Sequence, residues 1–483
     1  MLVSFTRTWV SVDANPMSPL SSFRKPSKLL KVIFEKASIV DGGGGKRFST
    51  DIALIGERIA RIGDCSGLEA LQRIDARALV LAPGFIDVNA HWKQRWFEPR
   101  SSAGSLSQGI TTAIEGACNS SVTAEQAGGL RGSLRLNLAR IAPPHREEIE
   151  RGACGLGISL SEALPSEEVL RTAKDARIPL VVHLRDRERG LLEEVDEAIA
   201  LARRHEMPLH ISKFSYAYGY DRALVHVALE RIDAARDRGL PITCDLFPYI
   251  ADEAPLGTLF PPSISSQARN DETMLSAMMH ARLHYGERWA RISLRAVRDE
   301  RRIEELGASI EAIAERRRLS CERTALALFD ELGSETPLLH RSLNEEDVAA
   351  VLSAEFACIG TADASYRFDD DPFRLPHPRA FGSFPRLFSR FVRARRTLAF
   401  EEAVRRCSAV PARIFGLHDR GAIREGAFAD LVLFDERAIA DTATYEAPAQ
   451  APVGIRGVFV NGTAVHGAST GEIAYPGRIL EPK

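Results

Sequence analysis

The chain begins and ends with stretches in which apolar and polar residues alternate. Residues 31–62 contain two of them, KVIFEKASIVDG and DIALIGERIARIG, joined by a run of glycines. The alternation returns at 428–435 in FADLVLFD and at 455–467 in IRGVFVNGTAVHG. A period of two is typical of a strand with one buried face. Each such strand leaves an apolar face that needs a partner, so we expect both chain ends to join in one small β-domain.

The middle of the chain alternates strand-like and helix-like segments. IPLVVHLRD, MPLHISKF and PITCDLFPY resemble buried strands, and EVDEAIALARRHE and VHVALERIDAARDRG between them have the period of amphipathic helices. This alternation predicts an α/β fold with a parallel sheet, and its length suits a TIM-type (β/α)8 barrel. Residues 265–350 are rich in Arg, Glu and Ala and indicate a helical insertion.

These patterns predict the domain organisation. The barrel spans 83–414, and a composite β-sandwich domain combines 31–82 with 415–483. Residues 1–30 are basic and rich in Ser and Pro, and we expect a disordered extension there. This extension is either a tail or the result of a misassigned start upstream of Met17.

Composition excludes several classes of partner. The formal net charge is -2, so no electrostatic argument favours nucleic acid or an anionic membrane. No apolar run approaches the 18 or so residues of a spanning helix. The seven cysteines are scattered without a CxxC pair, which indicates a reducing compartment. We therefore expect a cytoplasmic protein whose partner is a small molecule.

Polar residues that end the apolar runs are the candidates for chemistry, because functional side chains of a parallel barrel lie at the carboxyl ends of its strands. Imidazole, thiolate and carboxylate groups converging there could hold zinc. A histidine at a strand end can equally be a hydrogen-bonded structural residue, and a buried cysteine is usually inert. The pattern alone leaves both interpretations open for the candidates Asn89, His91, Cys118, His183, Lys213, Asp245 and Asp363.

Several segments resemble one known family. The sequence is similar to the amidohydrolase superfamily, and within it to the N-acyl-D-amino-acid deacylases, also called D-aminoacylases. The similarity runs from about residue 31 to 480 and is weakest in the predicted insertion. The segments that carry it are LAPGFIDVNAH (81–91), SQGITTAIEGAC (107–118), VHLRD (182–186), ITCDLFPY (242–249) and HPRAFGSFPRLFSRFVR (377–393).

This resemblance implies hydrolysis of the amide C–N bond of an N-acyl amino acid. It assigns one zinc ion to the ligands His91, Cys118 and His183. It places the substrate carboxylate against Tyr249 and Arg379, and a guanidinium fork suits a carboxylate. Lys213 would assist there. The residue that accepts the proton of the attacking water would be Asp363.

The sequence departs from the family pattern at three places. Asn89 replaces the first histidine of the usual HxH pair, and Lys213 replaces another histidine. His210 lies three residues earlier and should face the opposite side of its strand. Asp363 takes the position of the catalytic aspartate only with a one-residue insertion, and otherwise Ala362 does.

These departures keep two further functions open. We expect weak zinc binding or none, with the Lys213 ammonium partly replacing the metal charge beside Cys118 or Asp363. The chain could then be an inactive homologue that binds an acyl amino acid or a protein. It could also be a hydrolase or lyase for another cyclic or linear amide.

Overall fold

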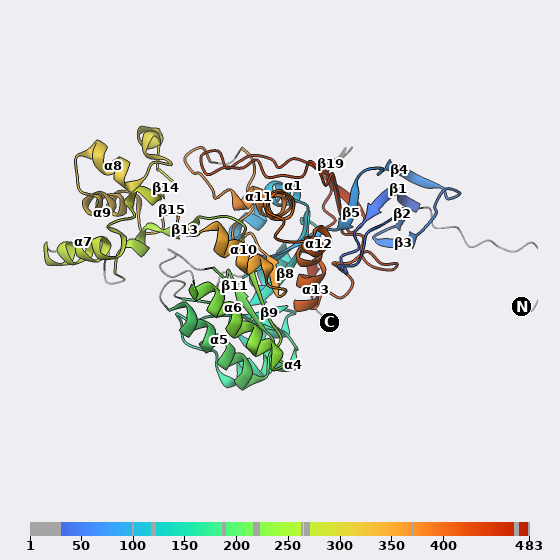
Figure 1. Cartoon of the computed structure of the whole chain (residues 1–483), viewed down its shortest axis with the longest axis horizontal. Helices are drawn as coiled ribbons and strands as arrows, with labels where there is room; N and C mark the ends of the chain where they lie inside the picture. Colours follow the sequence, from blue (N-terminus) through green and yellow to red (C-terminus); the bar gives the residue numbers. More distant parts are fainter. Residues whose placement is uncertain are drawn as a thin grey trace, which may run out of the picture.

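The structure is a computed structural model that describes residues 30–98, 101–116, 122–185, 190–215, 223–261, 264, 271–369, 371–467 and 473–481. It has three parts, which follow one another along the longest axis in Figure 1. A barrel lies in the middle, a sheet built from both chain ends lies on one side, and a mainly helical lobe lies on the other. The predicted fold class is confirmed.

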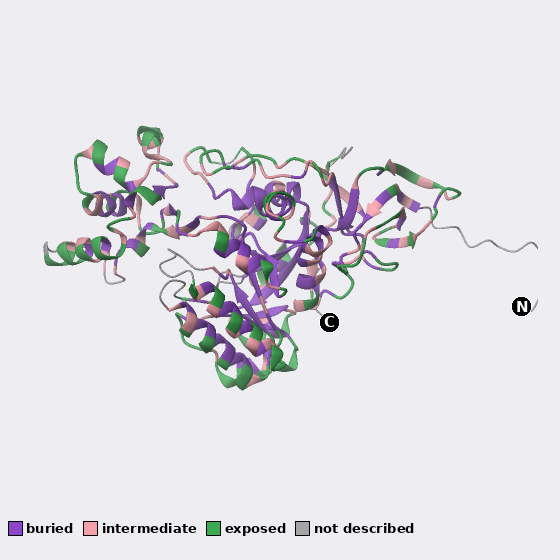
Figure 2. Cartoon of the chain, in the orientation of Figure 1, coloured by how far each residue is buried: buried purple, intermediate pink, exposed green. Residues whose placement is uncertain are grey.

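Eight parallel strands form the barrel, in the order in which they occur in the chain. They are β6 (Phe85–Ala90), β7 (Ile110–Glu115), β8 (Asn137–Ala142), β9 (Gly155–Ser159), β10 (Leu180–His183), β11 (Leu209–Ser212), β12 (Ile242–Leu246) and β16 (Ala357–Ile359). An isolated bridge from Ala90 to Asp363 joins β6 to the segment that follows β16. Nearly every strand residue is buried (Figure 2) because helices cover one face and the other fills the barrel. A short strand, β20 (Ile479–Leu480), runs beside β8.

Helices follow most of the barrel strands, as the alternating pattern predicts. Two long ones, α5 and α6, pack against each other in Figure 1, and their apolar faces belong to the main core. The helices outside the lobe are α1 (Ala103–Ser107), α2 (Ala124–Gly129), α3 (Arg146–Glu150), α4 (Glu167–Asp175), α5 (Leu191–His205), α6 (Ala223–Asp237), α10 (Glu345–Ser353), α11 (Arg379–Arg386), α12 (Phe400–Cys407) and α13 (Ala409–Ile414). A 3-10 helix, η1 (Lys93–Phe97), and a π-helix, η5 (Leu387–Ala394), complete this set. None of the described helices is long and apolar enough to cross a membrane.

The two chain ends pair in one sheet. The first end supplies β1 (Leu30–Ile39), β2 (Phe48–Ile55), β3 (Arg58–Ile62), β4 (Ala70–Asp75) and β5 (Val80–Pro83). The second end supplies β17 (Leu431–Phe434), β18 (Ile455–Val460) and β19 (Thr463–Gly467). The strand order is β19-β18-β17-β5-β1-β2-β3, with β4 beside β1. The antiparallel pairing of β5 with β17 joins the strands of the two chain ends.

The lobe, residues 252–340, has its own apolar core and a three-stranded antiparallel sheet. The sheet contains β13 (Asp252–Pro255), β15 (Pro337–His340) and β14 (Ile292–Leu294) in that order. The helical elements are η2 (Leu256–Leu259), α7 (Asp271–Tyr285), η3 (Trp289–Arg291), η4 (Glu300–Glu305), α8 (Ile310–Arg317) and α9 (Cys321–Leu332). The sequence predicted the helical character but not the short strands. Helix α10, which the predicted insertion included, packs on α6 and belongs to the barrel.

Candidate active site at the carboxyl ends of the barrel strands

Several predicted residues meet where the barrel strands end. His91 directly follows β6, His183 is the last residue of β10, and Lys213 directly follows β11. Burial, together with the neighbouring charges of Lys213, Arg379 and His183, lowers the pKa of His91 to about 3. His91 is therefore neutral, and these side chains lie within electrostatic reach of one another. Cys118 lies outside the described residues.

Asn89 is a fully buried hub that faces the barrel interior. Its Nδ2 donates to Asp245 Oδ2 at 3.0 Å and to Ser212 Oγ at 2.9 Å. A carboxylate only accepts, so Asp245 fixes the orientation of the amide. The Asn89 Oδ1 then accepts from His91 Nε2 at 2.7 Å. His91 must carry its proton on Nε2, which leaves only Nδ1 with a lone pair for a ligand.

Asp245 connects His210 to this hub. His210 is fully buried, and its Nε2 lies 3.1 Å from Asp245 Oδ1, which also accepts from the Lys213 backbone N–H at 3.1 Å. The expectation that His210 faces away from the site is therefore wrong. Strand alternation fails because Lys213 lies beyond β11 with a φ of 55°, in the left-handed region, where the period of two no longer holds.

A second buried carboxylate lies beneath the site. Asp87 accepts hydrogen bonds from the Thr361 N–H at 2.9 Å and from Thr361 Oγ1 at 2.6 Å. Burial nevertheless raises the pKa of Asp87 to about 6, because the hydrogen bonds from Thr361 and from the Asn89 N–H offset only part of the desolvation. Asp87 thereby holds the segment after β16 against β6.

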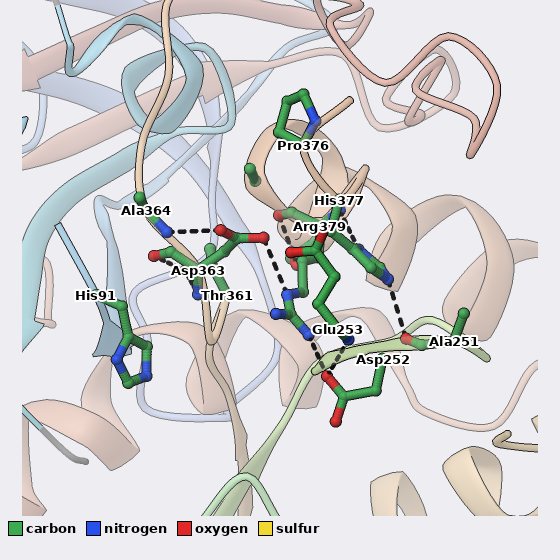
Figure 3. A network of polar contacts seen from close by, with 12 residues as sticks. His91, Ala251, Asp252, Glu253, Thr361, Asp363, Ala364, Pro376, His377 and Arg379 are labelled. Atoms are coloured by element: carbon green, nitrogen blue, oxygen red, sulfur yellow. Dashed lines mark hydrogen bonds and ion pairs between the residues drawn. The ribbon is translucent and has the colours of Figure 1, made fainter. Parts of the chain in front are cut away.

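The main electrostatic feature is a buried ion cluster of Lys213, Arg379, Asp252 and Asp363. Figure 3 shows Arg379 between Asp252 and Asp363. Arg379, at the start of α11, donates from Nε to Asp363 at 3.1 Å and from Nη1 to Asp252 at 2.7 Å. Lys213 Nζ lies 2.8 Å from the same Asp252 oxygen. Two cations are thus balanced by two carboxylates in a site with little solvent.

Asp363, and not Ala362, presents its side chain to this cluster. Its Oδ1 accepts from the Ala364 N–H at 2.8 Å while Oδ2 faces Arg379. Its carbonyl oxygen accepts from the His91 N–H at 3.0 Å, so the residue lies next to the end of β6. Ala362 packs instead among the aromatic rings of Phe247 and Tyr249. This geometry favours the alignment with a one-residue insertion, in which Asp363 takes the position of the catalytic aspartate.

Tyr249 has a different set of partners from Arg379. Its hydroxyl donates to Asp441 Oδ2 at 3.3 Å, and the Arg386 guanidinium lies over its ring. The ring over which Arg379 lies, 4.7 Å from its centroid, belongs to Phe247. The Tyr249 hydroxyl and the Arg379 guanidinium therefore contact different carboxylates, Asp441 in one case and Asp252 with Asp363 in the other.

Sequence reasoning missed the acid pair Asp252 and Glu253. Both lie on β13, shortly after the segment that the sequence analysis ended at Tyr249. Glu253 Oε1 is buried without a hydrogen-bond partner among the described residues. Burial and the Asp363 carboxylate raise the pKa of Glu253 to about 7. Two adjacent acids just beyond a strand end were the available signal.

The described donors do not form a metal centre by themselves. No group of three His, Cys, Asp or Glu side chains within the described ranges could hold a metal ion. Asn89 Oδ1 and His91 Nε2 are joined by a hydrogen bond, and the Lys213 ammonium has no lone pair to coordinate a metal. His183 and Nδ1 of His91 can each supply an imidazole nitrogen as a metal ligand. With a third donor they would fit a single zinc ion, and they do not fit two.

Comparisons with known proteins agree with this fold. A profile of the amidohydrolase family matches residues 269–466. N-acyl-D-glutamate deacylase of Alcaligenes xylosoxydans xylosoxydans is 28% identical, over 93% of this chain and 96% of its own length. N-acyl-D-aspartate deacylase of the same organism is 26% identical, over 93% of this chain and 95% of its own length.

A solved structure extends the comparison to three dimensions. The crystal structure of N-acyl-D-glutamate deacylase from Bordetella bronchiseptica covers 94% of this chain and all of its own, with a TM-score of 0.76 and 25% identity. That protein was solved with zinc and a phosphonate inhibitor that mimics the tetrahedral intermediate. Residues 269–466 thus match the amidohydrolase family, and over most of its length the chain is similar in sequence and fold to N-acyl-D-amino-acid deacylases.

Proposed function

We propose that this protein hydrolyses the amide C–N bond of N-acyl amino acids. The observation that carries the proposal is the buried cluster of Arg379, Lys213 and Asp363 at the carboxyl ends of the barrel strands. It offers two cations for a substrate carboxylate and one carboxylate for proton transfer. Two relatives that match 93% of the chain are deacylases of N-acyl-D-glutamate and N-acyl-D-aspartate.

The chain's own residues have distinct tasks in this proposal. Arg379 and Lys213 bind the carboxylate of the substrate and orient the acyl group toward His91. Asp363 Oδ2 accepts a proton from the attacking water and donates it to the nitrogen of the leaving amine. The Ala364 N–H, bonded to Oδ1 at 2.8 Å, holds that carboxylate in place during both transfers.

We further propose that one zinc ion completes the site. His91, through Nδ1, and His183 would hold it together with Cys118, which lies outside the described residues. Neutral imidazole is the form that binds zinc, and the lowered pKa of His91 provides it at neutral pH. When bound, the ion supplies Lewis acidity toward the acyl carbonyl. Asn89 and Lys213 exclude the second ion.

The test is a substrate panel on purified protein. N-acetyl-D-glutamate, N-acetyl-D-aspartate, their L-enantiomers and the corresponding α-carboxamides are incubated with enzyme, and acetate release is followed by NMR. We expect acetate from the N-acetyl-D-amino acids and little from the α-carboxamides. Loss of activity after dialysis against a chelator, and its return with zinc, supports the metal proposal. Acetate from the carboxamides alone would reject the proposed substrate class.

An inactive binding protein is the second candidate. It is favoured by the replacement of two usual ligand histidines by Asn89 and Lys213. In that case N-acyl amino acids bind but are not cleaved by zinc-loaded protein. Calorimetric titration of the zinc-loaded protein with the same N-acyl amino acids distinguishes binding without cleavage from hydrolysis.

A further inference from the structure

The cation pair that we assign to the substrate carboxylate already holds a carboxylate. Asp252 Oδ1 lies 2.8 Å from Lys213 Nζ and 2.7 Å from Arg379 Nη1. The same oxygen accepts from the Glu253 N–H at 2.8 Å. The three side chains are 5–12% exposed, so this is a desolvated carboxylate site and not a surface ion pair.

Asp252 belongs to a different part of the molecule from the cations. It is the first residue of β13, which pairs antiparallel with β15 in the sheet of the lobe, with Asp252 opposite His340. Arg379 starts α11 and Lys213 follows β11, and both elements belong to the barrel. The lobe therefore delivers a carboxylate into the barrel site (Figure 3).

Carboxylates of the protein already engage both cations. Lys213 and Arg379 are balanced by Asp252 and Asp363. Glu253 adds a third buried carboxyl group, and its raised pKa has the Asp363 charge among its causes. A substrate carboxylate that binds Lys213 and Arg379 must therefore compete with Asp252 for the same two cations.

We propose that Asp252 is a specificity-determining residue, an internal carboxylate that the α-carboxylate of an N-acyl amino acid must displace from Lys213 and Arg379. Only a ligand carboxylate can replace the interactions that Asp252 gives up. A neutral amide leaves Asp252 in place and gains nothing from the cations. The inference deepens the proposed function and rests on it.

The experiment is calorimetric titration of zinc-loaded wild type, Asp252→Asn and Asp252→Ala with N-acetyl-D-glutamate and with its α-carboxamide. Displacing a charged hydrogen-bond partner opposes binding in the wild type, so we expect both variants to bind the acid at least about tenfold more tightly. The affinity for the carboxamide should not change. The Asp252→Asn side chain retains an acceptor oxygen, so this variant should fold even where Asp252→Ala does not.

A matched control carries the same substitution at another buried aspartate. Asp430 pairs with Arg420 in the β-domain, far from the cluster in sequence and fold. Asp430→Asn should leave the affinity for the acid unchanged. Unfolding curves of all variants show that each is folded at the temperature of the titration.

The alternative is that Asp252 only positions the two cations. Unchanged or weaker binding of the acid in both Asp252 variants would overturn the proposal in favour of that role. If the variants bind the acid more tightly but neither they nor the wild type cleave it, the role of Asp252 is supported and the proposed hydrolase function is rejected. If the wild type cleaves the acid and the Asp252 variants bind it as the wild type does, only the role of Asp252 is rejected. If none of the proteins binds the acid, both the role of Asp252 and the proposed function are rejected.

Discussion

Replacing Arg379 by methionine should destabilise the fold strongly. Methionine retains most of the side-chain volume but removes the charge. The guanidinium is 5% exposed and makes two charge-assisted hydrogen bonds, at 3.1 Å to Asp363 and 2.7 Å to Asp252. Removing one partner of a buried ion pair leaves an uncompensated charge and costs about 3–5 kcal/mol. We expect a loss of this size in the free energy of unfolding.

The assay is equilibrium unfolding in urea, followed by circular dichroism, for wild type and Arg379→Met. The control is Arg77→Met. Arg77 also contacts a carboxylate, that of Asp75 at 2.5 Å, but the two side chains are 67% and 52% exposed. Water screens that pair, so its loss should not be measurable. A loss below about 1 kcal/mol for Arg379→Met would refute the reasoning, because it would mean that the cluster is hydrated.

The remaining predictions concern the metal, the pH dependence and the core. Lys213→His removes a cation that repels zinc and adds an imidazole, so zinc per chain after dialysis, measured by elemental analysis, should rise above the wild-type value. Burial raises the pKa of Asp87 to about 6, above an unfolded value of about 3.9, so the folded state holds a proton that the unfolded state releases. The free energy of unfolding should therefore fall as the pH rises from about 4 to about 6, and Asp87→Asn should lose this part of the pH dependence in urea titrations. Phe85 is fully buried and stacks on Phe384 at 5.4 Å between ring centroids. Phe85→Ala should cost about 3–5 kcal/mol of unfolding free energy, whereas truncating the 42% exposed Phe48 should change it by less than about 0.5 kcal/mol.

The sequence predicted the parts of the fold that local periodicity determines. The continuous apolar runs became barrel strands because both of their faces are buried. The alternating runs at the chain ends became strands of one sheet because each has a single apolar face. The short strands β14 and β15 escaped notice because three or four residues within a charged helical segment carry too little pattern.

The candidate site likewise contains residues that the sequence predicted and residues that it did not. His91, His183 and Lys213 follow from the rule that polar residues at strand ends converge. Asp252 could not be found by that rule, since it reaches the site on a strand of the lobe whose position depends on tertiary packing. The expected partner of Lys213 was Cys118 or Asp363, whereas the structure pairs its ammonium with Asp252. The left-handed turn at Lys213 likewise brought His210 into the network against the strand period.

The most direct test of the central claim is the rate of amino-acid release from N-acetyl-D-glutamate by zinc-loaded wild type and by Asp363→Asn. Asparagine keeps the shape of the side chain but cannot accept the proton of water, so it isolates the proposed chemistry. We predict measurable turnover by the wild type and a loss of about 100-fold or more in kcat for the variant. Equal rates for the two proteins, or no turnover by folded wild type with zinc bound, would contradict the assignment of this site to amide hydrolysis.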